Sequence, residues 1–158
     1  MLLTQTEAAS RFRAARVARL ATVAATGEPH LVPVTFAVIE ADERAAEPTQ
    51  LITFAVDAKP KSTTALRRLD NIAANPRVAF LADVYDDDWN RLWWVRADAC
   101  AGLLDGAVRD RALSALSAKY RQYRDVPPSG TVVGATVVRW SGWQATEVGH
   151  QQASPAQE

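Results

Sequence analysis

The segment Leu51-Ile52-Thr53-Phe54-Ala55-Val56-Asp57 leads through Ala58 into Lys59-Pro60-Lys61-Ser62 and then into a run from Thr63 to Asn75. The alternating apolar side chains of 51–57 predict a β-strand. Apolar side chains at helical spacing in 63–75 predict a helix; they are Ala65, Leu66, Leu69, Ile72 and Ala73. A helix N-terminus presents unpaired backbone N–H groups and the positive end of the helix dipole. We therefore predict a phosphate-binding site at Lys59, Lys61 and Ser62.

Upstream of this segment the sequence predicts two strands, at Val17–Ala25 and at His30–Glu40, joined by the turn 26–29. The second strand contains Pro33, which cannot donate to a β-ladder. Pro33 therefore indicates an edge strand, a bulge, or a place where something other than a strand lies alongside.

Downstream, alternating patterns predict strands at Arg77–Tyr85, Leu92–Leu104 and Thr131–Trp143. Two more helices are predicted: one starts at a capping box of Thr4 and Glu7, and one spans Asp105–Tyr123. Six strands with three sparse helices do not fit a regular βαβ series. The predicted fold is mainly β (α+β), an antiparallel barrel with flanking helices. Residues 1–146 are predicted to form one domain, and residues 147–158 a disordered tail.

Composition argues against several function classes. The chain has 158 residues and a net charge of +0, so bulk charge predicts neither a nucleic-acid nor a membrane partner. The sequence has no apolar run of membrane-spanning length, and the cytoplasm is the default compartment. The single cysteine, Cys100, is predicted to be a small packed residue of a strand. We expect no metal site, because the two histidines are far apart in sequence and Asp86-Asp87-Asp88 is typical of a solvated turn.

Several segments together resemble the opening of the pyridoxamine-phosphate-oxidase-like split β-barrel superfamily. These segments are 18–23, 27–30, 32–36, Lys59-Pro60-Lys61-Ser62, Leu66-Arg67-Arg68 and Asn75-Pro76-Arg77-Val78. The resemblance extends to about Trp143 and is greatest to the actinobacterial branch that uses the deazaflavin coenzyme F420. One departure is the C-terminal end, where Val138–Trp143 runs into a polar tail without the basic substrate-binding motif of true pyridoxamine phosphate oxidases. Oxidation of vitamin B6 is therefore not expected.

The resemblance implies a six-stranded split barrel and a homodimer with two cofactor sites at the subunit interface. It places Lys59, Lys61 and Ser62 on the cofactor phosphate. It places Pro33, Val34, Thr35 and Phe36 on the strand that lies along the cofactor ring. Trp93 falls on a strand that also lines the site. For the side chain of Phe36 the alternative is plain core packing.

These observations lead to one hypothesis and two alternatives. The hypothesis is an oxidoreductase that transfers a hydride between reduced coenzyme F420 and a small conjugated acceptor, with no catalytic side chain from the protein. Arg67, Arg68 and Arg77 are candidates to meet the acidic tail of the coenzyme, or else belong to a solvated face. The alternatives are an FMN-dependent enzyme on the same fold and a module that binds a flavin or haem without turnover. The sequence does not identify the acceptor.

Overall fold

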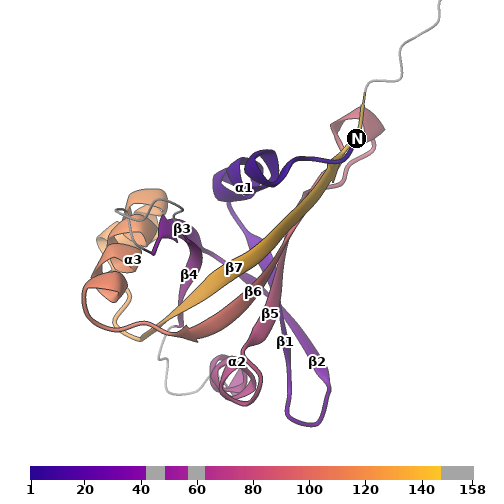
Figure 1. Cartoon of the computed structure of the whole chain (residues 1–158). Coiled ribbons are helices and arrows are strands. Elements are labelled where there is room, and N and C mark those ends of the chain that lie inside the picture. Colours follow the sequence, from indigo (N-terminus) through magenta and orange to yellow (C-terminus); the bar gives the residue numbers. More distant parts are fainter. Residues whose placement is uncertain (42–48, 57–62, 147–158) are drawn as a thin grey trace, which may run out of the picture.

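The strands of the chain form one antiparallel sheet in a computed structural model, which describes residues 1–41, 49–56 and 63–146 (Figure 1). The strands follow one another in the sheet in the order β2-β1-β5-β6-β7-β4-β3. Their bounds are β1 (Ala18–Val23), β2 (Pro29–Val34), β3 (Ala37–Glu40), β4 (Gln50–Val56), β5 (Arg77–Val84), β6 (Trp93–Leu103) and β7 (Thr131–Gln144).

The two edge strands of this sheet are neighbours in sequence. β2 and β3 lie at opposite ends of the strand order, yet only Thr35 and Phe36 separate them. Two residues can join opposite edges only if the sheet curls until those edges approach each other. The result is a barrel that is split between β2 and β3, and this confirms the split-barrel prediction.

The described sheet has seven strands rather than the predicted six, because the segment predicted as one strand from His30 to Glu40 is interrupted. At Phe36 the backbone N–H donates to the Tyr120 hydroxyl, and the Phe36 carbonyl accepts from the same hydroxyl, both at 3.0 Å. A backbone committed to a side chain in this way leaves the β-ladder. Alternating hydrophobicity runs straight through the break, so the pattern alone did not reveal it.

Four α-helices lie in the described part of the chain: α1 (Gln5–Ala14), α2 (Thr63–Ala74), α3 (Gly106–Lys119) and α4 (Arg121–Asp125). The predicted capping box at Thr4 and Glu7 is confirmed. The long helix predicted over 105–123 is wrong in one respect, because Tyr120 has extended backbone angles that separate α3 from α4. None of the described helices combines the length and the apolarity that crossing a bilayer requires.

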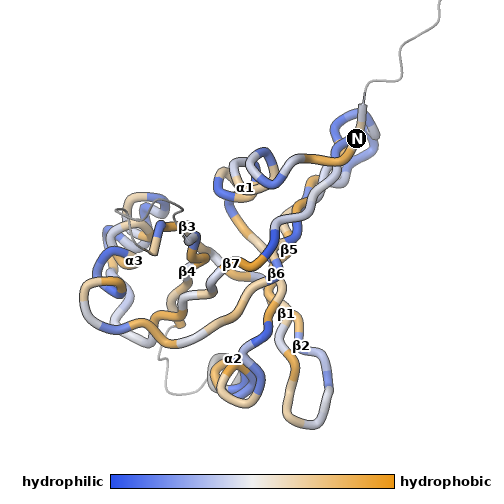
Figure 2. The backbone as a smooth tube through the Cα atoms, viewed as in Figure 1, coloured by the Kyte–Doolittle hydropathy of each residue, from blue (hydrophilic) through white to orange (hydrophobic). Residues whose placement is uncertain are grey.

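The core fills the inside of the curved sheet, and α1 closes one side of it (Figures 1 and 2). Phe12 of α1 is fully buried, and its ring centroid lies 4.6 Å from that of Phe36 and 5.1 Å from that of Trp140. On β6 the alternating residues Val95, Ala97, Ala99 and Ala101 face this core, as the alternation predicts.

Two expectations about packing are wrong. Cys100 is exposed, because it alternates with the inward alanines and lies on the outer face of the sheet. In α2, Ala73 is exposed while Asn71 is buried. The Asn71 amide donates to the Thr22 hydroxyl of β1 at 3.0 Å, so the buried face of α2 includes a polar pair and turns away from Ala73.

Candidate functional site

The free edge of β2 forms one wall of the split in the barrel. Within the described sheet β2 pairs only with β1, so its other edge offers unpaired backbone groups. Pro33 lies in this strand with its side chain exposed, whereas the Val34 side chain is buried. Of the three interpretations left open for Pro33, an edge strand is the one confirmed.

Thr35 and Phe36 lie at the end of the split where the chain passes from one sheet edge to the other. The Thr35 hydroxyl and the Tyr123 hydroxyl are 2.9 Å apart in an exposed pair. The Phe36 ring is fully buried in the core, so the core-packing alternative for this side chain is confirmed. The Phe36 N–H already donates to the Tyr120 hydroxyl, so it is not available to a ligand ring. Within the predicted segment, the backbone that remains available is that of Pro33–Thr35.

The predicted phosphate-binding residues Lys59, Lys61 and Ser62 lie outside the described residues. The helix predicted to follow them begins at Thr63, as expected. Two arginines of α2 differ sharply in their surroundings. Arg67 is exposed and lies 3.6 Å from the Glu28 carboxylate. Arg68 is partly buried and has no ion pair or hydrogen bond among the described residues, and its Nε atom is buried without a partner.

Burial lowers the pKa of the Arg68 guanidinium, because the charged form loses solvation with nothing to replace it. An unpaired buried charge is destabilising in a protein interior. Arg68 therefore marks a place where an anion would stabilise this protein, one and a half turns into the helix that follows the predicted phosphate-binding residues.

A second buried polar atom without a partner lies on the neighbouring hairpin. His30 of β2 stands opposite Thr22 of β1 in the register, and its Nδ1 atom is buried and unbonded. Thr22 in turn holds Asn71 of α2. The sequence pattern did not indicate Thr22 and Asn71 as a buried pair. The available signal was a polar residue on the inward face of each element, at positions where the pattern is otherwise apolar.

Trp93 does not lie beside the Pro33–Phe36 segment within one chain. It is the first residue of β6, and two strands, β1 and β5, separate β6 from β2. At about 4.8 Å per strand this places it roughly 14 Å from β2 across the sheet. Its ring is partly buried beneath α1, where the Arg11 guanidinium lies 5.3 Å from the ring centroid. Trp93 as a cofactor contact stays a prediction.

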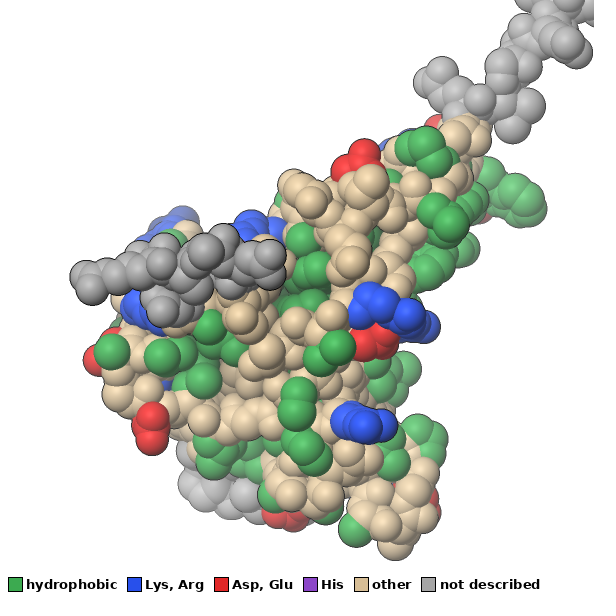
Figure 3. Space-filling view, in the orientation of Figure 1, with side chains coloured by type: hydrophobic (Ala, Val, Ile, Leu, Met, Phe, Trp, Pro, Cys, Tyr) green, Lys and Arg blue, Asp and Glu red, His purple; other side chains and the backbone are tan. Residues whose placement is uncertain are grey.

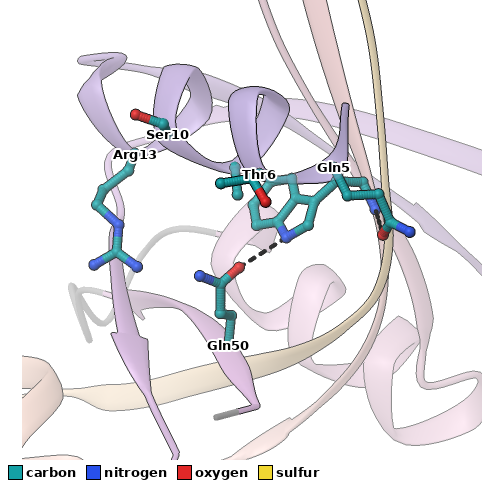
Figure 4. A pocket seen from close by; sticks show the side chains of 7 residues that line it. Gln5, Thr6, Ser10, Arg13 and Gln50 are labelled. Carbon is teal, nitrogen blue, oxygen red and sulfur yellow. Dashed lines mark hydrogen bonds between the residues drawn. The ribbon is translucent and has the colours of Figure 1, made fainter. Parts of the chain in front are cut away.

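A hollow of about 360 Å³ lies between α1 and the strands β4 and β7 (Figure 4). Several of its polar side chains already have partners. The Trp140 indole N–H donates to the Gln50 side chain at 2.8 Å, and Arg13 binds the Glu40 carboxylate at 3.0 Å. This hollow is built from α1 rather than α2, so it is separate from the residues predicted to hold a cofactor.

Comparison with protein families gives a match over residues 4–144 to the family described as "Pyridoxamine 5'-phosphate oxidase". The chain belongs to this family. The match covers all seven strands and four helices described above, in agreement with the fold predicted from the sequence. Among curated proteins, none matches the sequence.

Three solved structures of similar fold are distant from this chain in sequence. A FAD-binding protein from Mesorhizobium loti is 22% identical, with 93% of this chain and 97% of that chain covered and a TM-score of 0.64. A putative pyridoxamine 5'-phosphate oxidase from Corynebacterium glutamicum is 17% identical, with 93% and 95% covered and a TM-score of 0.53. The haem storage protein HutZ from Vibrio cholerae is 14% identical, with 90% and 95% covered and a TM-score of 0.60. At these identities the likeness shows the fold alone.

Proposed function

We propose that this member of the family binds coenzyme F420 in the split of its barrel and transfers a hydride between the reduced coenzyme and a small conjugated acceptor. The observation that carries the proposal is the unpaired, partly buried Arg68 in the helix that follows Lys59, Lys61 and Ser62. The free edge of β2 supports it, because a planar ring with polar atoms along its rim is suited to unpaired strand backbone.

The deazaflavin supplies the hydride chemistry, and this chain's residues bind and orient it. Lys59, Lys61 and Ser62 would neutralise and hydrogen-bond the phosphate, and Arg68 would add a further cation. The Pro33–Thr35 backbone would meet the ring edge. Pro33 suits this position because it has no N–H group to leave without a partner.

The Arg68→Gln variant is expected to bind coenzyme F420 about 10- to 150-fold more weakly than the wild type, since a hydrogen bond to a charged group contributes about 1.5–3 kcal/mol. The fold should persist, because removing an unpaired partly buried charge takes nothing from the protein's own contacts. Quenching of deazaflavin fluorescence on titration with protein measures the affinity, and thermal unfolding without coenzyme measures the stability.

Arg67→Gln is the matched control, because Arg67 is the adjacent arginine of the same helix but is exposed and lies near Glu28. It should bind the coenzyme within about twofold of the wild type, because exposed ion pairs contribute little. Equal affinity of the Arg68→Gln variant and the wild type would count against Arg68 as an anion contact. Wild-type protein that binds no F420 would overturn the proposal as a whole.

A second candidate is an FMN-dependent enzyme, or a flavin- or haem-binding module without turnover, on the same fold. The names of the solved relatives favour it, because one is a FAD-binding protein and one a haem storage protein. Parallel titrations with F420, FMN and haem distinguish the candidates by which spectrum changes. Reduced cofactor that is bound but never reoxidised by a panel of quinone-like and tetrapyrrole acceptors would favour the module.

We also propose that the protein is a homodimer that uses the outer face of its sheet, with the cofactor sites at the interface. On this face Leu31 and Leu81 are 67% and 38% exposed. Apolar side chains gather along the right-hand side of the molecule in Figure 3, with basic and acidic groups among them. Exposed apolar groups rimmed by charges are typical of protein interfaces.

The Leu81→Glu variant is expected to shift the protein from dimer to monomer. Leu81 stands between Arg19 and Arg96 in the register, and these two arginines are paired with Asp83 and Asp98. Because the Leu81 side chain is partly exposed, a glutamate there would stay solvated in the monomer and the fold should persist. Across a dimer interface the same carboxylate would be desolvated opposite the partner. Light scattering during size-exclusion chromatography measures the mass.

Val126→Glu, at a 75% exposed position after α4, is the control that should leave the mass unchanged. Wild-type protein that is monomeric at every concentration would contradict the dimer.

A further inference from the structure

The C-terminal ends of α1 and α3 meet beside Phe36 and bring three cationic side chains together. They are Arg13 and Arg16, near the end of α1, and Lys119, the last residue of α3. The Lys119 ammonium donates to the Arg13 backbone carbonyl at 3.2 Å and lies 3.8 Å from the centroid of the Phe36 ring. These two contacts, one of them to a buried core residue, hold the Lys119 ammonium in its position.

Within the described residues this cluster carries more positive than negative charge. Arg13 is paired with the Glu40 carboxylate at 3.0 Å. The Arg16 guanidinium stacks 4.8 Å from the Tyr120 ring centroid and makes no ion pair there, and Lys119 has no carboxylate partner either. Burial, followed by repulsion from Arg16 and Arg13, lowers the pKa of the Lys119 ammonium to about 8.

A purely structural role explains only part of this arrangement. A cation at a helix C-terminus is favourable, and an ammonium over an aromatic ring is attracted to it, so Lys119 stabilises the end of α1 and the Phe36 ring. Neither effect needs Arg16, whose charge makes the ammonium less stable. A bound oxyanion would offset the repulsion between Arg16 and Lys119.

The position of the cluster sets it apart from the cation on α2. Lys119 lies over Phe36, whereas Thr22, which binds Asn71 of α2, stands opposite His30 at the other end of β2. The six residue-to-residue steps from His30 to Phe36 span roughly 20 Å when extended. Beside the cluster, the exposed Thr35 and Tyr123 hydroxyls offer further hydrogen-bonding groups. The cluster therefore lies at the Phe36 end of the β2–β3 segment, whereas α2 packs near its His30 end.

We propose that Arg16 and Lys119 form a second anion-binding site, which takes the carboxylate or phosphate group of a small organic ligand at the end of the split away from α2. The structure describes both residues of this site. Neither Arg16 nor Lys119 is among the residues predicted to hold the cofactor, so the proposal does not depend on which cofactor occupies the split. A ligand held here would lie next to the Pro33–Thr35 backbone, which the proposed function assigns to the edge of the deazaflavin ring.

The chain is well suited to a direct test because it has only three lysines, Lys59, Lys61 and Lys119. Reductive dimethylation with ¹³C-formaldehyde keeps the lysine charge and gives one NMR signal set for each. The Lys119→Arg variant assigns its signal by loss. The pH titration of each signal is followed alone, with inorganic phosphate, with succinate, and with sodium chloride at matched ionic strength.

We expect the Lys119 signal to titrate below the ordinary pKa of a lysine, and phosphate or succinate to raise its pKa above the value in chloride. A response to both anions identifies a general oxyanion site, and a response to one identifies its class. A Lys119 signal that moves equally in chloride, or not at all, overturns the proposal. Movement of only the Lys59 and Lys61 signals also overturns it, while it leaves the predicted phosphate-binding site of the cofactor standing.

Two variants separate an anion site from a structural cluster. Arg16→Gln should raise the pKa of Lys119 in the absence of ligand, because one repelling charge is gone, and should abolish the response to added anion. Arg121→Gln removes a guanidinium that is 83% exposed on α4, and it should change neither value. An Arg16→Gln variant that keeps the full anion response would overturn the assignment of Arg16.

Discussion

Replacing Phe12 with alanine is expected to lower the free energy of unfolding by about 3–5 kcal/mol, the usual cost of deleting a buried aromatic ring. Phe12 is fully buried, and its ring lies within 4.6–6.4 Å, between centroids, of the rings of Phe36, Trp140 and Phe80. These partners come from the 35–36 crossing, β7 and β5, so one side chain of α1 joins the two halves of the curved sheet.

Urea unfolding followed by tryptophan fluorescence and by circular dichroism measures this loss. Tyr85→Ala is the control, because Tyr85 is an aromatic residue that is 64% exposed, and its removal should change stability by about 0.5 kcal/mol or less. If Phe12→Ala loses no more stability than Tyr85→Ala, this result contradicts the role of α1 in closing the core, which the burial of Phe12 indicates.

The Tyr120→Phe variant is expected to lose about 2–4 kcal/mol of stability, because each buried backbone group left without a partner costs about 1–3 kcal/mol. The Tyr120 hydroxyl accepts from the Phe36 N–H and donates its single hydrogen toward the carbonyls of Phe36 and Arg16. Burial raises the pKa of this hydroxyl, so it stays a donor at neutral pH. Without the hydroxyl both backbone groups of Phe36 become unsatisfied at the point where the chain changes sheet edge.

Tyr123→Phe is the matched control, since it removes one hydroxyl from the neighbouring ring but breaks only the exposed contact with Thr35. Its effect should stay near 0.5 kcal/mol or below. Chemical denaturation compares the two variants, and amide hydrogen exchange at Phe36 tests the cause. Fast exchange of the Phe36 amide in Tyr120→Phe, but not in Tyr123→Phe, supports the Tyr120 hydroxyl as the group that protects this backbone. Equal stability of the two variants would contradict that role.

The sequence alone determined the elements whose physics is local. Alternating side chains placed the strands 77–85, 92–104 and 131–143 close to their observed bounds, because a strand buried on one face needs that period. The Thr4 and Glu7 capping box needs only residues of one helical turn, and it is present as predicted. An edge position is one of the three that the sequence allows for Pro33, since proline's missing N–H group restricts where it can pair.

Only the tertiary structure decided the features that depend on residues far apart in sequence. The break between β2 and β3 comes from Tyr120, 84 residues after Phe36, so no local pattern contains it. Cys100 is exposed because the described part of the chain leaves its face of the sheet uncovered, although the side chains along β6 alternate as predicted. The charge of Arg16 lowers the pKa of Lys119 only because the C-terminal ends of α1 and α3 lie next to each other. Hydrophobic period and capping act within a few residues, whereas the pairing of charges and hydroxyls is fixed by the whole chain's packing.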